Sequence, residues 1–379
     1  MGPTARRRKH LMRVYAGMDP RLPLRDIPAH ARRIERLGYD GLHIAETIHD
    51  PFLASMAALQ STSTLVVRTS VALALVRSPM AVAYSAWDLA AFSDGRFQLG
   101  LGTQIRPHIE RRFGAAFDDP VGRLRDHIGA VRACWAAFDG LAPLDYRSEH
   151  YSLDLLTPNF TPDPLATGVQ RPSIWMGGVN RRLLETAGRI ADGFVTHPTN
   201  SHPRYLREVC RPGLEVGANA AGRSVDDVEL VVGTQWILGA TRADLDERRE
   251  HNRRLLAFLY STPAYERTLE LFGWAELAGR LRSLIRESRW NDLSLLVTDE
   301  VLDTLVPQPF STNFLASPPN GSPASPRVCS SRRHRAPNTT THWPPRSPNS
   351  EIAEPSAAGE GASDVARDDF LTREGLGLG

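Results

Sequence analysis

Short apolar runs alternate with amphipathic segments from Arg13 to Leu238. The intervening segments, such as Leu24–Leu37 and Pro120–Phe138, place their apolar residues at helical spacing. This alternation predicts a parallel sheet with helices packed outside it. Further helices are expected from Arg242 to about Leu305. The apolar runs that read as strands are Arg13–Gly17, Tyr39–Ala45, Leu65–Val76, Phe97–Gly102, Ser173–Met176, Ala191–Thr196 and Val228–Leu238.

The repeated strand–helix units could form either a doubly wound sheet or a TIM-type barrel. No glycine fingerprint for a dinucleotide and no phosphate-binding loop motif occurs, which argues against a doubly wound sheet. The pattern instead favours a TIM-type (β/α)8 barrel, with Leu144–Leu153 as a hairpin excursion. An eighth strand is expected after Leu305, but none is recognisable there, so we expect a barrel that lacks this strand.

The composition changes abruptly at Pro307. Residues 307–379 are rich in Pro, Ser, Thr and Arg and show no periodic apolar pattern, so this tail is expected to be disordered. A shifted reading frame near codon 307 would account for the change. We therefore divide the chain into a flexible extension (1–11), a barrel domain (12–306) and a disordered tail (307–379).

Composition narrows the class of protein only slightly. The 379 residues are 41% hydrophobic and 23% charged with a net charge of +2, which gives no indication of a nucleic-acid partner. The three cysteines lack CxxC spacing, so neither a disulfide framework nor a metal site is expected. No secretory signal or membrane-length apolar run is evident. We expect a cytoplasmic protein without a membrane partner.

The stretch from Gly95 to His108 carries the first indication of chemistry. The apolar run FQLGLG ends in Gly100 and Gly102 and opens at once into a polar loop that holds Thr103 and Arg106. Ligands of parallel α/β proteins bind at this end of a strand, and glycine there allows a ligand or another backbone to approach. The alternative is a plain core strand followed by a solvated helix start.

The order and spacing of several motifs resemble a known family. The motifs are GYDGLHIAE, VALALVRSPMAVAYSAWDLAAFSDGRFQLGLGTQ, EHYSL and PSIWMGGVNRRLLETAGRIADGFVTHP. Together they resemble the bacterial luciferase-like superfamily of flavin and deazaflavin (coenzyme F-420) oxidoreductases over roughly Arg13 to Leu305. The segment GLGTQIRPHIERRFG is similar to the actinobacterial F-420-dependent subgroup. The resemblance implies a TIM barrel and hydride transfer between F-420 and a small organic substrate.

The resemblance also implies where the cofactor would bind. A cis peptide bond is expected at Ser70–Val71, against the cofactor ring. The glycines before the helix that starts near Asn180 are expected to receive the cofactor phosphate, because bare backbone N–H groups at a helix start bind anions; the alternative there is a simple tight turn. The candidate cofactor-binding residues are Glu46, Ser70, Val71, Gly102, Thr103, Arg106, Gly177, Gly178, Val179 and His197.

The catalytic candidates depart from the pattern of the F-420-dependent relatives. Thr47 stands where several relatives have a histidine, with His49 two residues later, and Gln104 follows where some relatives have a catalytic glutamate. Thr47, His49 and His108 are the candidates for substrate chemistry, although a lone loop histidine is more often simply solvated. Homodimers are common in the superfamily, but no segment identifies an interface.

Two alternative functions stay open at this stage. One is a luciferase-like monooxygenase that uses reduced flavin mononucleotide (FMN). The other is an inactive family member, truncated before its last strand. The missing eighth strand motivates this second alternative.

Overall fold

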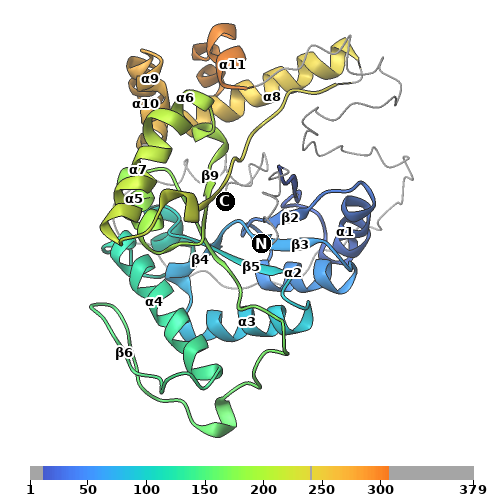
Figure 1. Ribbon diagram of the computed structural model, residues 1–379. Coiled ribbons are helices and arrows are strands. Elements are labelled where there is room, and N and C mark those ends of the chain that lie inside the picture. The colour runs from blue at the N-terminus through green and yellow to red at the C-terminus, as the bar shows by residue number, and fades with distance from the viewer. Residues whose placement is uncertain (1–11, 240, 307–379) are drawn as a thin grey trace, which may run out of the picture.

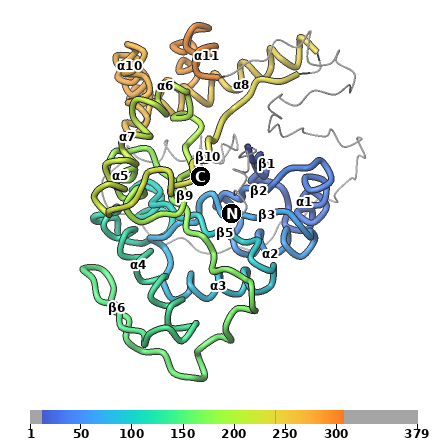
Figure 2. Tube along the Cα trace, in the orientation of Figure 1, coloured from blue at the N-terminus to red at the C-terminus, as the bar shows by residue number. Residues whose placement is uncertain are grey.

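Seven parallel strands form one sheet, and their spatial order follows the sequence. Figure 2 traces the chain from its N-terminal part (blue) through this region to the last described helices (orange). The computed structural model describes residues 12–239 and 241–306. Each strand is hydrogen-bonded in parallel to the next one along the chain. A short further strand, β4 (Ala72–Leu73), follows β3 (Val66–Thr69) and also pairs with β5 (Phe97–Gly102). The seven are β1 (Tyr15–Gly17), β2 (Gly41–Ile44), β3 (Val66–Thr69), β5 (Phe97–Gly102), β8 (Ile174–Gly178), β9 (Gly193–Thr196) and β10 (Glu229–Val231).

Helices lie on the outer side of this curved sheet (Figure 1). Proline begins α2 (Pro51–Gln60), α3 (Pro79–Phe92) and α4 (Pro120–Phe138). The side chains of Asp50 and Ser78 cap α2 and α3 by accepting backbone N–H groups. The hairpin of β6 (Tyr146–Arg147) and β7 (Ser152–Leu153) lies outside the barrel. The barrel helices are α1 (Ile27–Arg36), α2 (Pro51–Gln60), α3 (Pro79–Phe92), α4 (Pro120–Phe138), α5 (Arg181–Ile190), α6 (Pro203–Tyr205) and α7 (Arg211–Ala220).

A second group of helices packs at one end of the barrel, at the top of Figure 1. It consists of α8 (Arg242–Tyr260), α9 (Glu266–Leu271), α10 (Ala275–Arg286) and α11 (Asp299–Leu305), and it has its own buried apolar cluster. The Tyr260 hydroxyl donates to the Thr199 carbonyl at 2.8 Å and so ties α8 to the loop after β9. Among the described residues, no helix is both long and apolar enough to cross a membrane.

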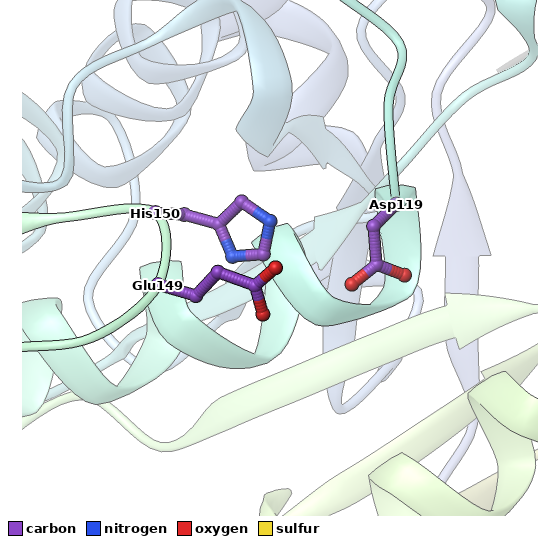
Figure 3. Close-up of side chains that lie close together, drawn as sticks. All are labelled: Asp119, Glu149 and His150. Carbon is purple, nitrogen blue, oxygen red and sulfur yellow. The ribbon is translucent and has the colours of Figure 1, made fainter.

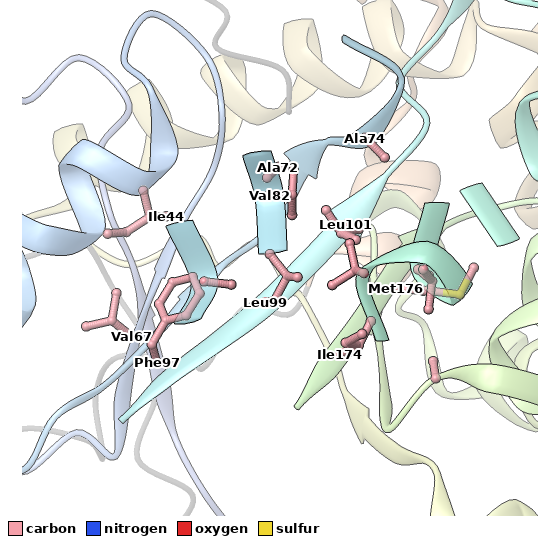
Figure 4. Close-up of a cluster of buried hydrophobic side chains, with 14 of the residues drawn as sticks. Ile44, Val67, Ala72, Ala74, Val82, Phe97, Leu99, Leu101, Ile174 and Met176 are labelled. Atoms are coloured by element: carbon pink, nitrogen blue, oxygen red, sulfur yellow. The ribbon is translucent and has the colours of Figure 1, made fainter. Parts of the chain in front are cut away.

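The main apolar core lies between the sheet and its helices, as the outward-facing side chains of β5 illustrate. Phe97, Leu99 and Leu101 are fully buried beside Val67 and Met176 of neighbouring strands (Figure 4). They alternate with Gln98, Gly100 and Gly102, because successive side chains of a strand point to opposite faces. The face of β5 that points into the barrel therefore carries only glycine and a polar side chain. Each large apolar side chain on the outer face contributes about 1.5–3 kcal/mol to the free energy of folding through its burial.

The expected strands are confirmed, with two differences. The run Leu65–Val76 divides into β3, β4 and a 3-10 turn at Ala74–Val76, because the chain bends at Ser70–Val71, whose peptide bond is cis. The run Val228–Leu238 forms a strand only over Glu229–Val231. Among the described residues β10 pairs with β9 alone, and no strand on its other side continues the pairing beyond Val231.

The sheet is open between β10 and β1 in the part of the chain that is described. No ladder joins these two strands, and no strand follows β10 within residues 232–239 and 241–306. An exposed ion pair between Arg13 and Glu229, at 3.7 Å, links the two edges. The expectation of seven barrel strands is confirmed for these residues. The expected extension at 1–11 and the expected disordered tail at 307–379 lie outside the described residues.

Gly100 allows β3 and β5 to approach at the point where their ladder ends. The Thr69 hydroxyl donates to the Gly100 carbonyl and accepts the Gly100 N–H, both at 2.8 Å. A Cβ at position 100 would overlap the Thr69 carbonyl oxygen. We expect Gly100→Ala to lower the free energy of unfolding by about 3 kcal/mol, since overpacking against backbone has little room to relax.

The matched control for this change is Gly279→Ala. Gly279 lies inside α10 and has nothing within 4 Å of the position of a Cβ, so alanine is expected to stabilise the chain by up to about 1 kcal/mol. Urea unfolding of both variants tests the contrast. Equal stability of Gly100→Ala and the unaltered chain would contradict the proposed close approach.

Candidate functional site

A cavity of about 2160 Å³ opens where the strands end. Its walls come from the carboxyl ends of β1, β2, β3, β5, β8 and β9, from residues 231–236, and from α8 and the turn that contains Tyr265. It also extends along the open side of the sheet as far as Arg13 and Glu229. Of the thirteen predicted site residues, the cavity brings together eight: Ser70, Val71, Gly102, Thr103, Gly177, Gly178, Val179 and His197.

Val71 forms the floor of the cavity between two glycines. The Ser70–Val71 peptide bond is cis, which confirms the expectation from the resemblance. A Cβ on Gly102 would lie 2.5 Å from one Val71 methyl group, and a Cβ on Gly177 would lie 2.9 Å from the other. Glycine is therefore required on both sides of Val71, and the backbone of β5 and β8 borders the cavity without side chains in front of it.

The start of α5 forms one wall of the cavity. The Asn180 side chain caps this helix by accepting the Leu183 N–H at 2.9 Å, and the Tyr205 hydroxyl holds the Val179 carbonyl at 3.1 Å. Gly177, Gly178, Val179 and Asn180 all line the cavity. The first N–H groups of a helix have no partner within the helix, so this wall can bind an anion such as a phosphate.

His197 and Tyr265 form the wall that comes from the loop after β9 and the turn after α8. Their rings stack at 4.7 Å. The Nδ1 atom of His197 accepts the Thr199 N–H at 3.3 Å, which leaves its Nε2–H for the cavity. Burial lowers the pKa of His197 to about 4 and raises the pKa of Tyr265 to about 12. Both groups are therefore neutral hydrogen-bond donors at physiological pH.

Tyr265 and Trp236 are cavity residues that the sequence did not indicate. The indole N–H of Trp236 is buried and has no hydrogen-bond partner among the described residues. Both residues belong to the segment after β10. The spacing of apolar residues in that segment does not predict where it lies over the sheet. Only the packing of α8 on the barrel end places them at the cavity.

Glu46 does not line the cavity, although its neighbour Ala45 and its hydrogen-bonding partner Leu73 do. It is 4% exposed and accepts the Leu73 N–H at 2.7 Å and Nη1 of Arg77 at 2.7 Å. Arg77 also reaches Asp50, the cap of α2, at 2.9 Å. Burial raises the pKa of Glu46, and Arg77 opposes that rise. The carboxylate thus fastens the segment after the floor to the end of β2.

The three catalytic candidates and Arg106 also lie outside the cavity lining. Arg112 donates to the Thr47 carbonyl, and burial with the nearby Arg112 charge lowers the pKa of His108. Nε2 of His49 is buried without a partner among the described residues. Arg106 is exposed and pairs with Glu110 at 2.5 Å. Thr47, His49 and His108 lie at the same end of the sheet as the cavity, and their catalytic role stays a prediction.

One group of potential metal ligands occurs among the described residues, away from the cavity. Figure 3 shows Asp119 at the start of α4, near Glu149 and His150. Asp119 and Glu149 are exposed, and Asp119 faces Arg182 at 3.4 Å. His150 Nδ1 is bonded to Asp126 at 2.8 Å. Asp119 and His150 thus have protein partners, and the group carries no argument for a metal centre.

The Glu46–Arg77 pair predicts a pH-dependent stability. Removing the guanidinium by Arg77→Met leaves a buried carboxylate unpaired, which should cost about 3–5 kcal/mol at neutral pH. A carboxyl group whose folded pKa is raised contributes stability below its unfolded pKa and loses it as the pH rises through the folded pKa. The variant should therefore be closer to the unaltered chain at pH 5 than at pH 8.

Urea unfolding at these two pH values measures the difference. Arg147→Met is the control, because Arg147 pairs with Asp145 and Asp154 on the exposed hairpin and should contribute at most about 1 kcal/mol. A deficit of Arg77→Met that is the same at both pH values would show that the unpaired Glu46 charge is not its cause.

Comparison with known proteins agrees with this fold and cavity. The model of the luciferase-like monooxygenase family matches residues 8–308. An uncharacterized protein of Mycobacterium tuberculosis is 40% identical over 269 residues, which cover 71% of this chain and 78% of that protein. The F-420-dependent glucose-6-phosphate dehydrogenase of Intrasporangium calvum is 27% identical over 233 residues, 55% of this chain and 64% of that protein.

A solved structure shares the fold. The coenzyme F-420-dependent tetrahydromethanopterin reductase from Methanopyrus kandleri superposes with a TM-score of 0.62 at 20% identity, over 77% of this chain and 84% of that one. This similarity concerns the arrangement of strands and helices alone. From the extent of the family match and the 40% identity, the chain belongs to the luciferase-like monooxygenase family.

Proposed function

We propose that this chain is an oxidoreductase that transfers a hydride between coenzyme F-420 and a small organic substrate. The observation that carries the proposal is the floor at Ser70–Val71, set between Gly102 and Gly177 and next to the start of α5. A flat ring system can lie on such a floor, where neighbouring backbone is not covered by side chains. A phosphate attached to it can then reach the N-terminus of α5.

The residues at the cavity fit a deazaflavin. Ser70, Val71, Gly102 and Thr103 would contact the ring, and Gly177, Gly178 and Val179 would bind the phosphate. The Trp236 N–H, which has no partner in the described ranges, offers a further donor for an oxygen of the cofactor or the substrate. The cofactor would supply the hydride chemistry, while the protein orients the two reactants and excludes water.

The opposite wall suits a substrate with an acceptor oxygen. His197 and Tyr265 are neutral donors, and within the described part of the chain neither has a charged group as a hydrogen-bond partner. A neutral imidazole N–H can polarise a carbonyl group without giving up its proton. We therefore assign substrate contact to His197 and Tyr265, in addition to the cofactor contact expected for His197. Thr47, His49 and His108 are proposed catalytic residues of the adjoining loops.

Two alternatives rest on specific observations. The name of the matched family describes monooxygenases, which favours reduced FMN as the alternative cofactor. In the described residues the sheet is open between β10 and β1, and this observation supports the alternative that the chain is inactive. The relative from Intrasporangium calvum is named for F-420, which is why the deazaflavin stands first.

Direct binding separates these functions. We expect the purified full-length chain to bind F-420 with a dissociation constant in the micromolar range or below, measured by the change in its fluorescence, and to bind FMN at least about tenfold more weakly. Tighter binding of FMN than of F-420 would show that the cofactor is the flavin and not the deazaflavin. Binding of neither cofactor would favour the inactive alternative.

A change of charge at the start of α5 tests whether the cofactor phosphate binds there. Val179→Glu places a carboxylate at the start of α5, where it repels a phosphate, and should weaken F-420 binding about tenfold or more. Val216→Glu is the matched control, since Val216 is exposed on α7 and lies outside the cavity lining. The proposed phosphate position is wrong if the two variants bind F-420 equally well.

A further inference from the structure

A buried arginine lies inside the barrel, one layer below the floor of the cavity. Arg68 on β3 has no solvent-exposed surface, and its partners come from the neighbouring strands. Nε donates to the Gln98 side chain at 2.8 Å, Nη1 contacts His43 Nε2 at 3.1 Å, and Nη2 reaches the Tyr15 hydroxyl at 3.4 Å. All three partners belong to the strands that surround it, so the guanidinium lies in the barrel interior.

Aromatic rings enclose the same guanidinium. Its central carbon lies 3.3 Å from the centroid of the Trp175 ring and 4.7 Å from that of Tyr15. Gly193 on β9 leaves room for the Trp175 ring, because a Cβ at that position would overlap it. The arginine is thus held in place by hydrogen bonds and by cation–π contacts, which depend on its charge.

No carboxylate balances this charge at contact distance. Within residues 12–239 and 241–306, the hydrogen-bonding partners of Arg68 are an amide, an imidazole and a phenol. Burial beside the guanidinium lowers the pKa of His43 to about 3, so this imidazole is neutral. Glu229 acts on Arg68 only through its field, and its carboxylate pairs with Arg13 at the open side of the sheet.

The charge lies close to the proposed cofactor ring. Arg68 precedes Ser70 by two residues on one strand, and Trp175 precedes Gly177 by two residues on another. Two residues of a strand span about 7 Å, so the guanidinium layer lies about that far below the floor. Tyr15 and His43 of the same layer line the cavity. A buried cation without a counter-ion is costly, and a negative charge on the floor would offset that cost.

The two redox forms of the cofactor differ in this charge. A hydride carries two electrons and one proton, so its addition to an oxidised deazaflavin or flavin leaves one more negative charge on the ring unless a second proton follows. Charge near the ring is one of the means by which a protein tunes such a cofactor. We propose that Arg68 makes the site bind the reduced cofactor in preference to the oxidised one, an inference that rests on the proposed function.

The ratio of two dissociation constants tests this proposal. The full-length chain should bind reduced F-420 more tightly than oxidised F-420, with both constants measured anaerobically by titration. Arg68→Met should reduce that preference about tenfold or more, because it removes a unit charge that acts on the ring through a partly polar interior. A tenfold change in the ratio corresponds to about 30 mV in the midpoint potential of a two-electron couple.

Three further variants separate charge from packing. Arg68→Lys keeps the charge and should keep most of the preference, whereas Arg68→Gln removes the charge but keeps a donor and should lose it. Arg96→Met is the matched control, because Arg96 bonds to the Leu59, Leu65 and Ser93 carbonyls at the opposite end of the barrel. This control should leave the ratio unchanged.

The outcomes distinguish this inference from the proposed function. If Arg68→Met and Arg68→Gln bind both forms with the unaltered ratio, Arg68 only fills the barrel and the inference is overturned, while F-420 binding stands. If the variants do not fold, a lack of preference for the reduced form in the unaltered chain overturns the inference. If the chain binds FMN alone, the proposed function fails, and the same ratio measured with FMN decides the role of Arg68.

Discussion

The close approach of three glycines to the end of β3 is the constraint on which the cavity depends. Gly100 lies against the Thr69 carbonyl, and Gly102 and Gly177 lie on either side of Val71. A side chain at any of these positions would occupy space that the end of β3 already fills. Because the backbones meet there, Val71 becomes a floor rather than one more outward-facing core residue. The strand ends around it then define one continuous cavity.

Around this floor, charge is distributed unevenly. Glu46 and Arg77 form an ion pair beside the floor, in which the Glu46 carboxylate accepts hydrogen bonds from both Arg77 and the Leu73 N–H. Arg68, below the floor, has only neutral hydrogen-bonding partners among the described residues, and His197 on the cavity wall is kept neutral by burial. Near the floor the cavity thus offers the neutral donors His197, Tyr265 and Trp236, and the Arg68 guanidinium lies one layer below. Such an environment favours ligands that carry acceptor oxygens or negative charge.

Much of the fold could be predicted because it depends on local pattern. Apolar runs with β-branched residues became strands, and Pro51, Pro79 and Pro120 marked the starts of helices. The glycine-rich strand end at Gly102 and the helix start after Gly178 were also recognisable, since both depend on backbone geometry that glycine allows. Glu46 was different: its position in the chain suggested a ligand contact, yet its partners Leu73 and Arg77 come from another strand end.

The sequence by itself determined the order of strands and helices, the family and the region of the floor. Periodicity, glycine and proline act within a few residues of the chain, so they can be read along it. Only the tertiary structure decided that Tyr265 stacks on His197 and that Arg68 lies among Tyr15, His43, Gln98 and Trp175. Those contacts join residues from separate strands and helices. Their burial and their charge balance exist only once the sheet has curved around them.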